Sequence, residues 1–155
     1  MEHQGWEIYW HYHFKQRFIK LLSEVEKLAK KNPENFIDSP AYKHFKSVKT
    51  VVFDRISHNP TDKQFNLGNT LGKTFRHWKR AKKEMPPRYR VFFQYSSSQN
   101  TIILAWLNDE KSIRRDGHKH DVYNVFKKML SNKTMPNTYN DLVDNSDEVD
   151  GNFMK

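Results

Sequence analysis

Cationic and aromatic residues alternate along residues 73–95, KTFRHWKRAKKEMPPRYRVFFQY, and this alternation favours a β-hairpin whose two strands meet at Pro86-Pro87. Between residues 73 and 90 the segment holds eight Lys and Arg but a single carboxylate, Glu84. A rigid cationic hairpin that carries aromatic rings suits a polyanion whose bases can stack, and single-stranded RNA fits that description best. The alternative is an edge hairpin whose charges serve solubility alone.

The two faces of this hairpin are expected to differ, because successive side chains of a strand point to opposite sides of a sheet. Trp78, Arg80 and Lys82 should share one face of the first strand, and Arg88 and Arg90 one face of the second. The other face of the sheet is left to pack on helices. Cations on strands are held more firmly than cations on loops, and transition-state stabilisation needs that precision. The pattern therefore favours a nuclease over a passive binder.

Charge is unevenly distributed along the chain. The 155 residues carry a formal charge of +9, but residues 140–155 hold five carboxylates and one Lys, so the remainder is near +13. A basic body of this size favours a nucleic acid or another acidic partner. The length predicts one domain, residues 1–139. Few apolar residues follow Pro136, so residues 140–155 are expected to form an acidic, loosely ordered tail.

Composition also excludes several kinds of site. The chain has no cysteine, which rules out disulfides and thiolate zinc sites. Its first residues, MEHQGWEIYW, lack the charged and apolar regions of a secretory signal, and no apolar run approaches the length of a membrane span. We therefore expect a soluble, cytoplasmic protein without membrane contact.

Hydrophobic periodicity predicts the element order β-α-α-β-β-β-α. The predicted strands cover residues 6–11, 78–83, 89–95 and 101–107. The predicted helices cover residues 14–31, residues 40–56 and the segment after Asp121, with Ser39 and Asp121 as N-caps. This order predicts an α+β fold in which the helices pack on one face of a small, mainly antiparallel sheet.

Two short motifs have the composition of binding sites. His118-x-His120, with Asp116 and Asp121 beside it, offers metal-ligand side chains, yet the neighbouring Arg and Lys would repel a divalent cation. We therefore expect an exposed polar loop and no metal, although a His can still act as a general acid or base. The segment Gly68–Gly72 lacks the Lys-Ser/Thr that follows a phosphate-binding loop, so a turn is expected there.

An ordered set of short motifs spans more than a hundred residues of the chain. The set comprises Gly5-Trp6, Asn32-Pro33-Glu34-Asn35, Trp78-x-Arg80-x-Lys82, Arg88-Tyr89-Arg90, Phe92-Phe93-x-Tyr95, Ile102-Ile103-Leu104-x-Trp106-x-Asn108-Asp109-Glu110 and Tyr123-x-x-Phe126-x-Lys128-Met129-Leu130. With these motifs the chain resembles the YhaV-type toxins of type II toxin–antitoxin systems, within the RelE-like superfamily. Toxins of this group adopt the element order predicted above.

The resemblance implies an endoribonuclease that cuts mRNA, commonly at the ribosome, without a metal or other cofactor. The 2′-hydroxyl of the substrate would attack the adjacent phosphorus and leave a 2′,3′-cyclic phosphate. By analogy with the RelE-like pattern, Arg90 is a phosphate clamp, and the catalytic residues are Arg80, Lys82, Arg90, Arg115 and Tyr123. The expected RNA contacts are Lys73, Arg76, Trp78, Lys79, Lys83, Arg88, Arg114, Lys119 and His120. A Tyr, a Lys with a lowered pKa and His120 all remain candidates for the proton carrier.

The resemblance also implies a partner, a PrlF-like antitoxin with an AbrB-type DNA-binding fold, which would silence the toxin and bind operator DNA together with it. The acidic tail is a rival occupant of the basic groove. Two other functions fit the same hairpin: a non-catalytic RNA- or ribosome-binding protein, and a DNA-binding module that acts in a complex. Cleavage of RNA by the purified chain in excess EDTA would distinguish a metal-independent toxin from both of these alternatives.

Overall fold

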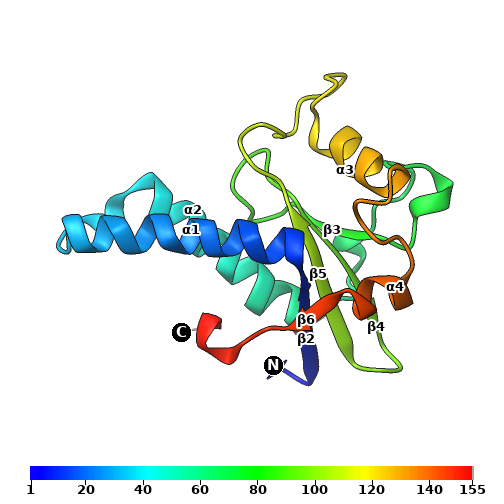
Figure 1. The fold of residues 1–155 in the computed structure, drawn as a ribbon, viewed down its shortest axis with the longest axis horizontal. Helices are drawn as coiled ribbons and strands as arrows, with labels where there is room; N and C mark the ends of the chain where they lie inside the picture. The colour runs from blue at the N-terminus through cyan, green and yellow to red at the C-terminus, as the bar shows by residue number, and fades with distance from the viewer. Residues whose placement is uncertain (155) are drawn as a thin grey trace.

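A mixed β-sheet lies at the centre of the fold (Figure 1). The structure, a computed structural model, describes residues 1–154. Within them the strands are β1 (Glu2–His3), β2 (Trp6–His11), β3 (Lys79–Ala81), β4 (Val91–Ser96), β5 (Thr101–Leu107) and β6 (Ser146–Glu148). They lie in the order β1-β2-β5-β4-β3, and β6 pairs with β2. β2 and β5 run parallel, whereas the other described pairs are antiparallel.

The helices begin where the sequence places capping residues. α1 (Tyr12–Lys31) starts after His11, and α2 (Pro40–Thr50) starts after Ser39, whose hydroxyl accepts a hydrogen bond from the Tyr42 amide at 3.2 Å. α2 continues directly into a π-helical segment, Val51–Ile56. α3 (Val122–Ser131) follows Asp121, and α4 (Tyr139–Asp144) follows Thr138. No helix in the described part of the chain is long and apolar enough to cross a membrane.

These elements confirm the predicted α+β class and the mainly antiparallel sheet. β2 and β5 have the predicted bounds, and α2 with its π-helical extension covers the predicted second helix. β3 lacks the predicted residues 78 and 82–83, and β4 lacks the predicted residues 89–90 but extends to Ser96. β1, α4 and β6 were not predicted.

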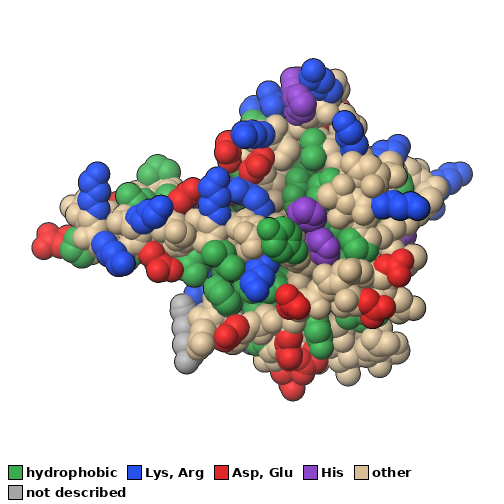
Figure 2. All heavy atoms as spheres, in the orientation of Figure 1, with side chains coloured by type: hydrophobic (Ala, Val, Ile, Leu, Met, Phe, Trp, Pro, Cys, Tyr) green, Lys and Arg blue, Asp and Glu red, His purple; other side chains and the backbone are tan. Residues whose placement is uncertain are grey.

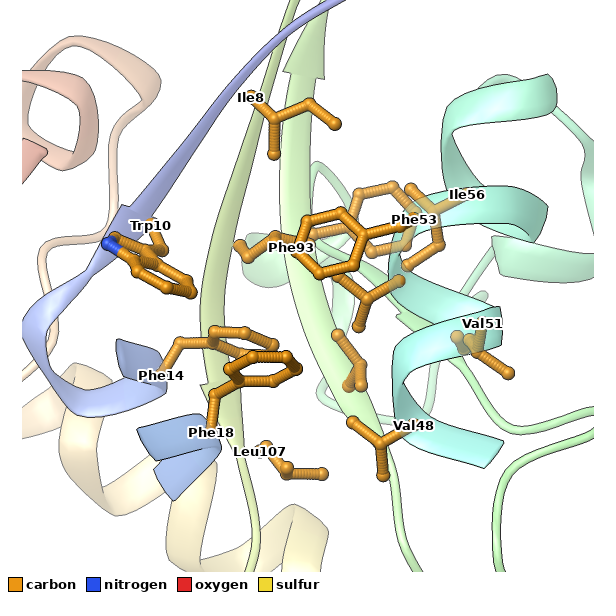
Figure 3. Close-up of a cluster of buried hydrophobic side chains, with 14 of the residues drawn as sticks. Ile8, Trp10, Phe14, Phe18, Val48, Val51, Phe53, Ile56, Phe93 and Leu107 are labelled. Atoms are coloured by element: carbon orange, nitrogen blue, oxygen red, sulfur yellow. The ribbon is translucent and has the colours of Figure 1, made fainter. Parts of the chain in front are cut away.

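The arrangement of the helices differs from the prediction, because they cover both faces of the sheet rather than one. α1, α2 and the π-helical segment pack against one face, which includes Phe93 and Leu104 (Figure 3). α3 and α4 pack against the other face, which includes Phe92 and Ile103. The physical reason is that β4 and β5 are nearly continuous apolar runs, and such strands bury both of their faces.

The acidic C-terminal segment is packed, although its composition favoured a loosely ordered tail. β6 pairs with β2 at the sheet edge opposite β3, as the red segment beside β2 shows in Figure 1. Leu142 is 0% exposed in the core beneath α3, and Val149 is 2% exposed in the core beneath α1. The segment has few apolar residues, but Leu142, Val143, Val149 and Phe153 all pack in or against a core. The expectation of a loosely ordered tail is therefore wrong for residues 140–154.

Leu142→Ala should lower the free energy of unfolding by about 2–5 kcal/mol, because it leaves a cavity at a fully buried position. Asp144→Ala is the matched control, since Asp144 is an exposed residue of the same helix. Urea denaturation of both variants measures the difference. Equal stability of the two variants would show that α4 does not pack as described.

Candidate active site

The hydroxyl of Tyr123 joins two arginines that come from distant parts of the chain. It accepts a hydrogen bond of 2.6 Å from Arg80 Nη1 and one of 3.2 Å from Arg90 Nε. Arg80 lies on β3, Arg90 directly precedes β4, and Tyr123 lies in the first turn of α3. We call these three residues the Arg80–Tyr123–Arg90 cluster. Both guanidinium groups are half-buried, while Tyr123 is 7% exposed.

Strand register explains why the two arginines meet. Arg80 pairs with Phe92 across β3 and β4, and Arg90 is two residues before Phe92. All three side chains therefore point to one face of the sheet. The prediction left the helices to the opposite face, but α3 covers this one. The ring of Tyr123 packs edge-on against Phe92 with 5.9 Å between the centroids. Packing of α3 on β4 thus brings the phenol to the arginines.

Asp121 fixes the start of α3 and the loop before it. Its carboxylate, which is 3% exposed, accepts hydrogen bonds from Arg114 Nη1 at 2.7 Å, the Arg115 amide at 2.6 Å and the Tyr123 amide at 3.1 Å. The hydrogen bond to Asp121 raises the pKa of Arg114, whose guanidinium lies 5.1 Å from the centroid of the Tyr123 ring. The loop therefore adds a third cation to the ring that Arg80 also approaches, at 5.7 Å.

Some polar atoms of these arginines are not satisfied. Within the described part of the chain, Arg80 Nε and Arg115 Nε are buried and have no hydrogen-bond partner. A buried N–H group without a partner is costly and unusual.

An open groove of about 600 Å³ runs from Arg90 along the hairpin turn. Its lining consists of Gln64, Lys82, Lys83, Pro86, Pro87, Arg88 and Arg90. Lys82 and Lys83 are exposed and lie beyond the end of β3, so Lys82 is not held by the strand as the alternation predicted. Four cations on one groove suit a polyanion, while the catalytic role of Lys82 stays a prediction.

The other predicted RNA contacts lie outside the Arg80–Tyr123–Arg90 cluster. Lys73 is exposed, and Arg76 Nε donates to Asn69 Oδ1 at 3.0 Å. Lys79 Nζ donates to Asn66 Oδ1 at 2.9 Å, and burial lowers the pKa of this Lys. Lys119 and His120 are exposed in the loop before α3.

Trp78 is the predicted contact that the structure argues against. Its side chain is 0% exposed and packs edge-on against Phe126 with 4.9 Å between the centroids. Its indole Nε1 donates to Asn137 Oδ1 at 2.9 Å. Strand alternation places Trp78 on the predicted face, but α3 covers that face. A buried indole cannot stack on a base, so the expectation of RNA contact by Trp78 is corrected.

The His118-x-His120 motif contributes no assembled metal site among the described residues, which contain no group of three or more His, Asp or Glu side chains with a suitable arrangement. The rings of His118 and His120 lie 5.6 Å apart. Burial and the nearby Arg115 lower the pKa of His118. Asp116 and Asp121 both pair with Arg114. The side chains that would complete a metal site are therefore engaged with a cation.

Charge is segregated on the surface that Figure 2 shows. Lys and Arg are frequent around α3 and the loop before it, where one group of His also lies, and a cluster of Asp and Glu lies near β1 and β6, whereas α1 carries both signs. At the acidic end, Glu148 accepts a hydrogen bond of 2.7 Å from the N-terminal ammonium group, which also lies 3.6 Å from Glu7. The hydrogen bond to this ammonium lowers the pKa of Glu148. The acidic end lies across the sheet from the cluster.

Comparison with known proteins identifies relatives over nearly the whole chain. Residues 8–147 match the YhaV toxin family, described as toxins with endonuclease activity of a toxin–antitoxin system. The chain is 38% identical over 146 residues to the ribonuclease toxin YhaV of Escherichia coli K12, covering 94% of each protein. It is 38% identical over 145 residues to the toxin YhaV of Escherichia coli O6:H1, covering 93% of this chain and 94% of the relative. No solved structure matches significantly.

Asp121→Ala should lower the free energy of unfolding by about 3 kcal/mol, because it removes the counter-charge of Arg114 and the cap of α3. This value is at the low end for a buried pair, since the Arg114 side chain is 32% exposed. Asp121→Asn keeps a capping oxygen and should lose less. Asp116→Ala is the control, because the Asp116 side chain is 97% exposed. Chemical denaturation that finds Asp121→Ala as stable as Asp116→Ala would contradict this role of Asp121.

Proposed function

The chain belongs to the YhaV family of toxins with endonuclease activity from toxin–antitoxin systems, and we propose that it cleaves mRNA without a metal, through the Arg80–Tyr123–Arg90 cluster. The observation that carries this proposal is the Tyr123 hydroxyl shared by Arg80 and Arg90 beside an open cationic groove. Cleavage by an internal 2′-hydroxyl needs an oriented RNA, stabilised charge on phosphorus and two proton transfers. The cluster offers fixed cations and an ionisable hydroxyl in one place.

The hydrogen bonds of Tyr123 favour a donor role. A phenol oxygen can accept two hydrogen bonds, and Arg80 and Arg90 supply two. The proton of the hydroxyl is then left to donate to a phosphate oxygen or to the leaving 5′-oxygen. Arg80 and Arg90 would stabilise the charge that develops on the phosphoryl oxygens.

The remaining predicted catalytic residues take positions that suit the same reaction. Lys82 lies on the groove with Arg90 and would contact the phosphate or take the proton of the 2′-hydroxyl. Arg115, a half-buried arginine in the loop before α3, would contact a phosphate oxygen. Lys83 and Arg88 on the groove, and the surrounding cations Lys73, Arg76, Lys79, Arg114, Lys119 and His120, would hold the rest of the RNA.

Incubation of the purified chain with RNA in excess EDTA tests the proposal. The expected result is cleavage that leaves a 2′,3′-cyclic phosphate. RNA binding without cleavage would instead support a non-catalytic RNA- or ribosome-binding protein, and cleavage that EDTA abolishes would contradict metal independence.

We further propose that a PrlF-like antitoxin with an AbrB-type fold silences this toxin by laying an acidic segment over the groove. The position of the acidic C-terminal segment favours inhibition by a separate protein, because β6 lies at the sheet edge opposite β3 and therefore away from the groove. Residues 140–154 are therefore not seated on the groove. We expect the toxin to act in the cytoplasm on mRNA, in association with ribosomes, and the complex with the antitoxin to repress its own operon.

Arg80→Ala and Arg90→Ala should each abolish growth inhibition and slow RNA cleavage by about 10²–10³-fold, because each removes a contact to the charge of the transition state. Arg55→Ala is the control, since Arg55 is an exposed arginine that pairs with Glu84 at 2.6 Å. Growth inhibition and cleavage rates are measured at matched expression and protein concentration. Normal inhibition by both cluster variants would show that the chemistry lies elsewhere.

Tyr123→Phe should reduce the rate of RNA cleavage by at least about 10²-fold with little loss of stability, because it removes the shared hydroxyl but keeps the ring against Phe92. Tyr139→Phe removes a hydroxyl that donates to Gln99 Oε1 at 3.0 Å and serves as the control. Single-turnover rates and thermal unfolding of both variants separate catalysis from stability. Equal cleavage by the two variants would remove Tyr123 from the mechanism.

A further inference from the structure

A buried amide side chain, that of Asn108, lies where β5 ends and the loop to α3 begins. Asn108 is 0% exposed and directly follows Leu107, the last residue of β5. A buried amide that lacks partners destabilises a fold, so its hydrogen bonds indicate what it holds in place.

The Asn108 amide makes three hydrogen bonds, all to main-chain groups. Its Oδ1 accepts from the Arg90 amide at 2.8 Å. Its Nδ2 donates to the Ser112 carbonyl at 2.9 Å and to the Arg88 carbonyl at 3.2 Å. Asn108 therefore connects the approach to β4, which carries Arg90, with the loop that carries Arg114.

The backbone near Arg88 depends on this connection. Arg88 has a φ of +71°, a left-handed conformation that is uncommon for a residue other than glycine. Its carbonyl accepts from Asn108 Nδ2 and also from the Arg114 amide at 2.9 Å. One carbonyl thus links the backbones of Arg88 and Arg114, and Asn108 fixes the direction in which it points.

The hydrogen bonds of Asn108 influence the Arg80–Tyr123–Arg90 cluster through Arg90 and Arg114. Arg90, whose amide is held by Asn108, directs its Nε to the Tyr123 hydroxyl. Arg114, whose amide is held by the Arg88 carbonyl, places its guanidinium over the Tyr123 ring. Asn108 itself is buried beneath these groups and has no exposed surface to offer the RNA.

We propose that Asn108 is a positioning residue for the nuclease, whose side-chain amide sets the relative placement of Arg90 and Arg114 about Tyr123. The inference rests on the proposed ribonuclease function. A misplaced catalytic group slows the chemical step more than it weakens binding. Loss of the Asn108 hydrogen bonds therefore slows the chemical step by a much larger factor than it weakens RNA affinity, which falls only slightly through Arg114.

Asn108→Asp tests this role with almost no change in volume. The new carboxylate can still accept from the Arg90 amide, but it replaces the donating nitrogen with an oxygen that repels the carbonyls of Arg88 and Ser112. Thr101→Val is the matched control at the other end of β5, because it removes one hydrogen bond of a buried side chain, to the Gln99 carbonyl at 3.0 Å. Asn108→Ser, which shortens the side chain, is the second variant if Asn108→Asp does not fold.

Two quantities are measured separately: the single-turnover cleavage rate at saturating enzyme, and the affinity for 2′-O-methyl RNA, which lacks the attacking hydroxyl. Asn108→Asp should slow cleavage by about 10²-fold and change affinity by less than about threefold. Thr101→Val should change neither, although both variants lose stability. The Arg90 Nε–H signal in NMR spectra should shift in Asn108→Asp and stay in place in Thr101→Val.

Three outcomes would overturn the role of Asn108: an unchanged cleavage rate in a folded Asn108 variant, an equal fall in rate and affinity, or an equal loss of rate in Thr101→Val. These outcomes are distinct from failure of the proposed function, in which the unmodified chain would not cleave RNA. The two claims can therefore fail independently.

Discussion

The placement of two guanidinium groups on one phenol oxygen is the constraint on which the rest of the site depends. Arg80 and Arg90 carry like charges that repel each other, so the surrounding structure must hold them together. The register of β3 with β4 points both to one face, and α3 brings Tyr123 to that face. Asp121, nearly buried, supplies the negative charge that holds Arg114 nearby. Without RNA, the guanidinium groups of Arg80, Arg90 and Arg114 repel one another, and the negative charge of a bound phosphate would reduce that repulsion.

The layered fold separates this site from the acidic part of the chain. β3 forms one edge of the sheet, whereas β1 and β6 form the opposite edge, where both pair with β2. The carboxylates of the C-terminal segment therefore stay away from the basic groove, although they lower the net charge of the protein. A polyanion that approaches this molecule meets repulsion at one end and attraction at the other, which would orient it toward the groove.

Sequence patterns predicted the elements better than their packing. Strand alternation predicted a cationic face for each strand of the hairpin, and the resemblance to known toxins supplied Tyr123, but neither showed that Arg80, Arg90 and Tyr123 touch. The same alternation misled for Trp78, because a period of two gives the face of a side chain and not the helix that later covers it. The composition of the acidic segment likewise gave no sign of the packing of Leu142 and Val149, since a few well-spaced apolar residues can anchor a segment that is otherwise polar. Asn108 stood in the sequence as one polar residue after an apolar strand, and its three main-chain partners are visible only in three dimensions.

The most direct test of the central claim is a crystal structure of the protein bound to 2′-O-methyl RNA, which can occupy the site but cannot be cleaved. The account predicts a phosphate within hydrogen-bond distance, about 3 Å, of the guanidinium groups of Arg80 and Arg90 and of the Tyr123 hydroxyl. It also predicts the neighbouring nucleotides in the groove lined by Lys82, Lys83 and Arg88. RNA bound in a single well-defined register elsewhere, with no phosphate at the Arg80–Tyr123–Arg90 cluster, would contradict it.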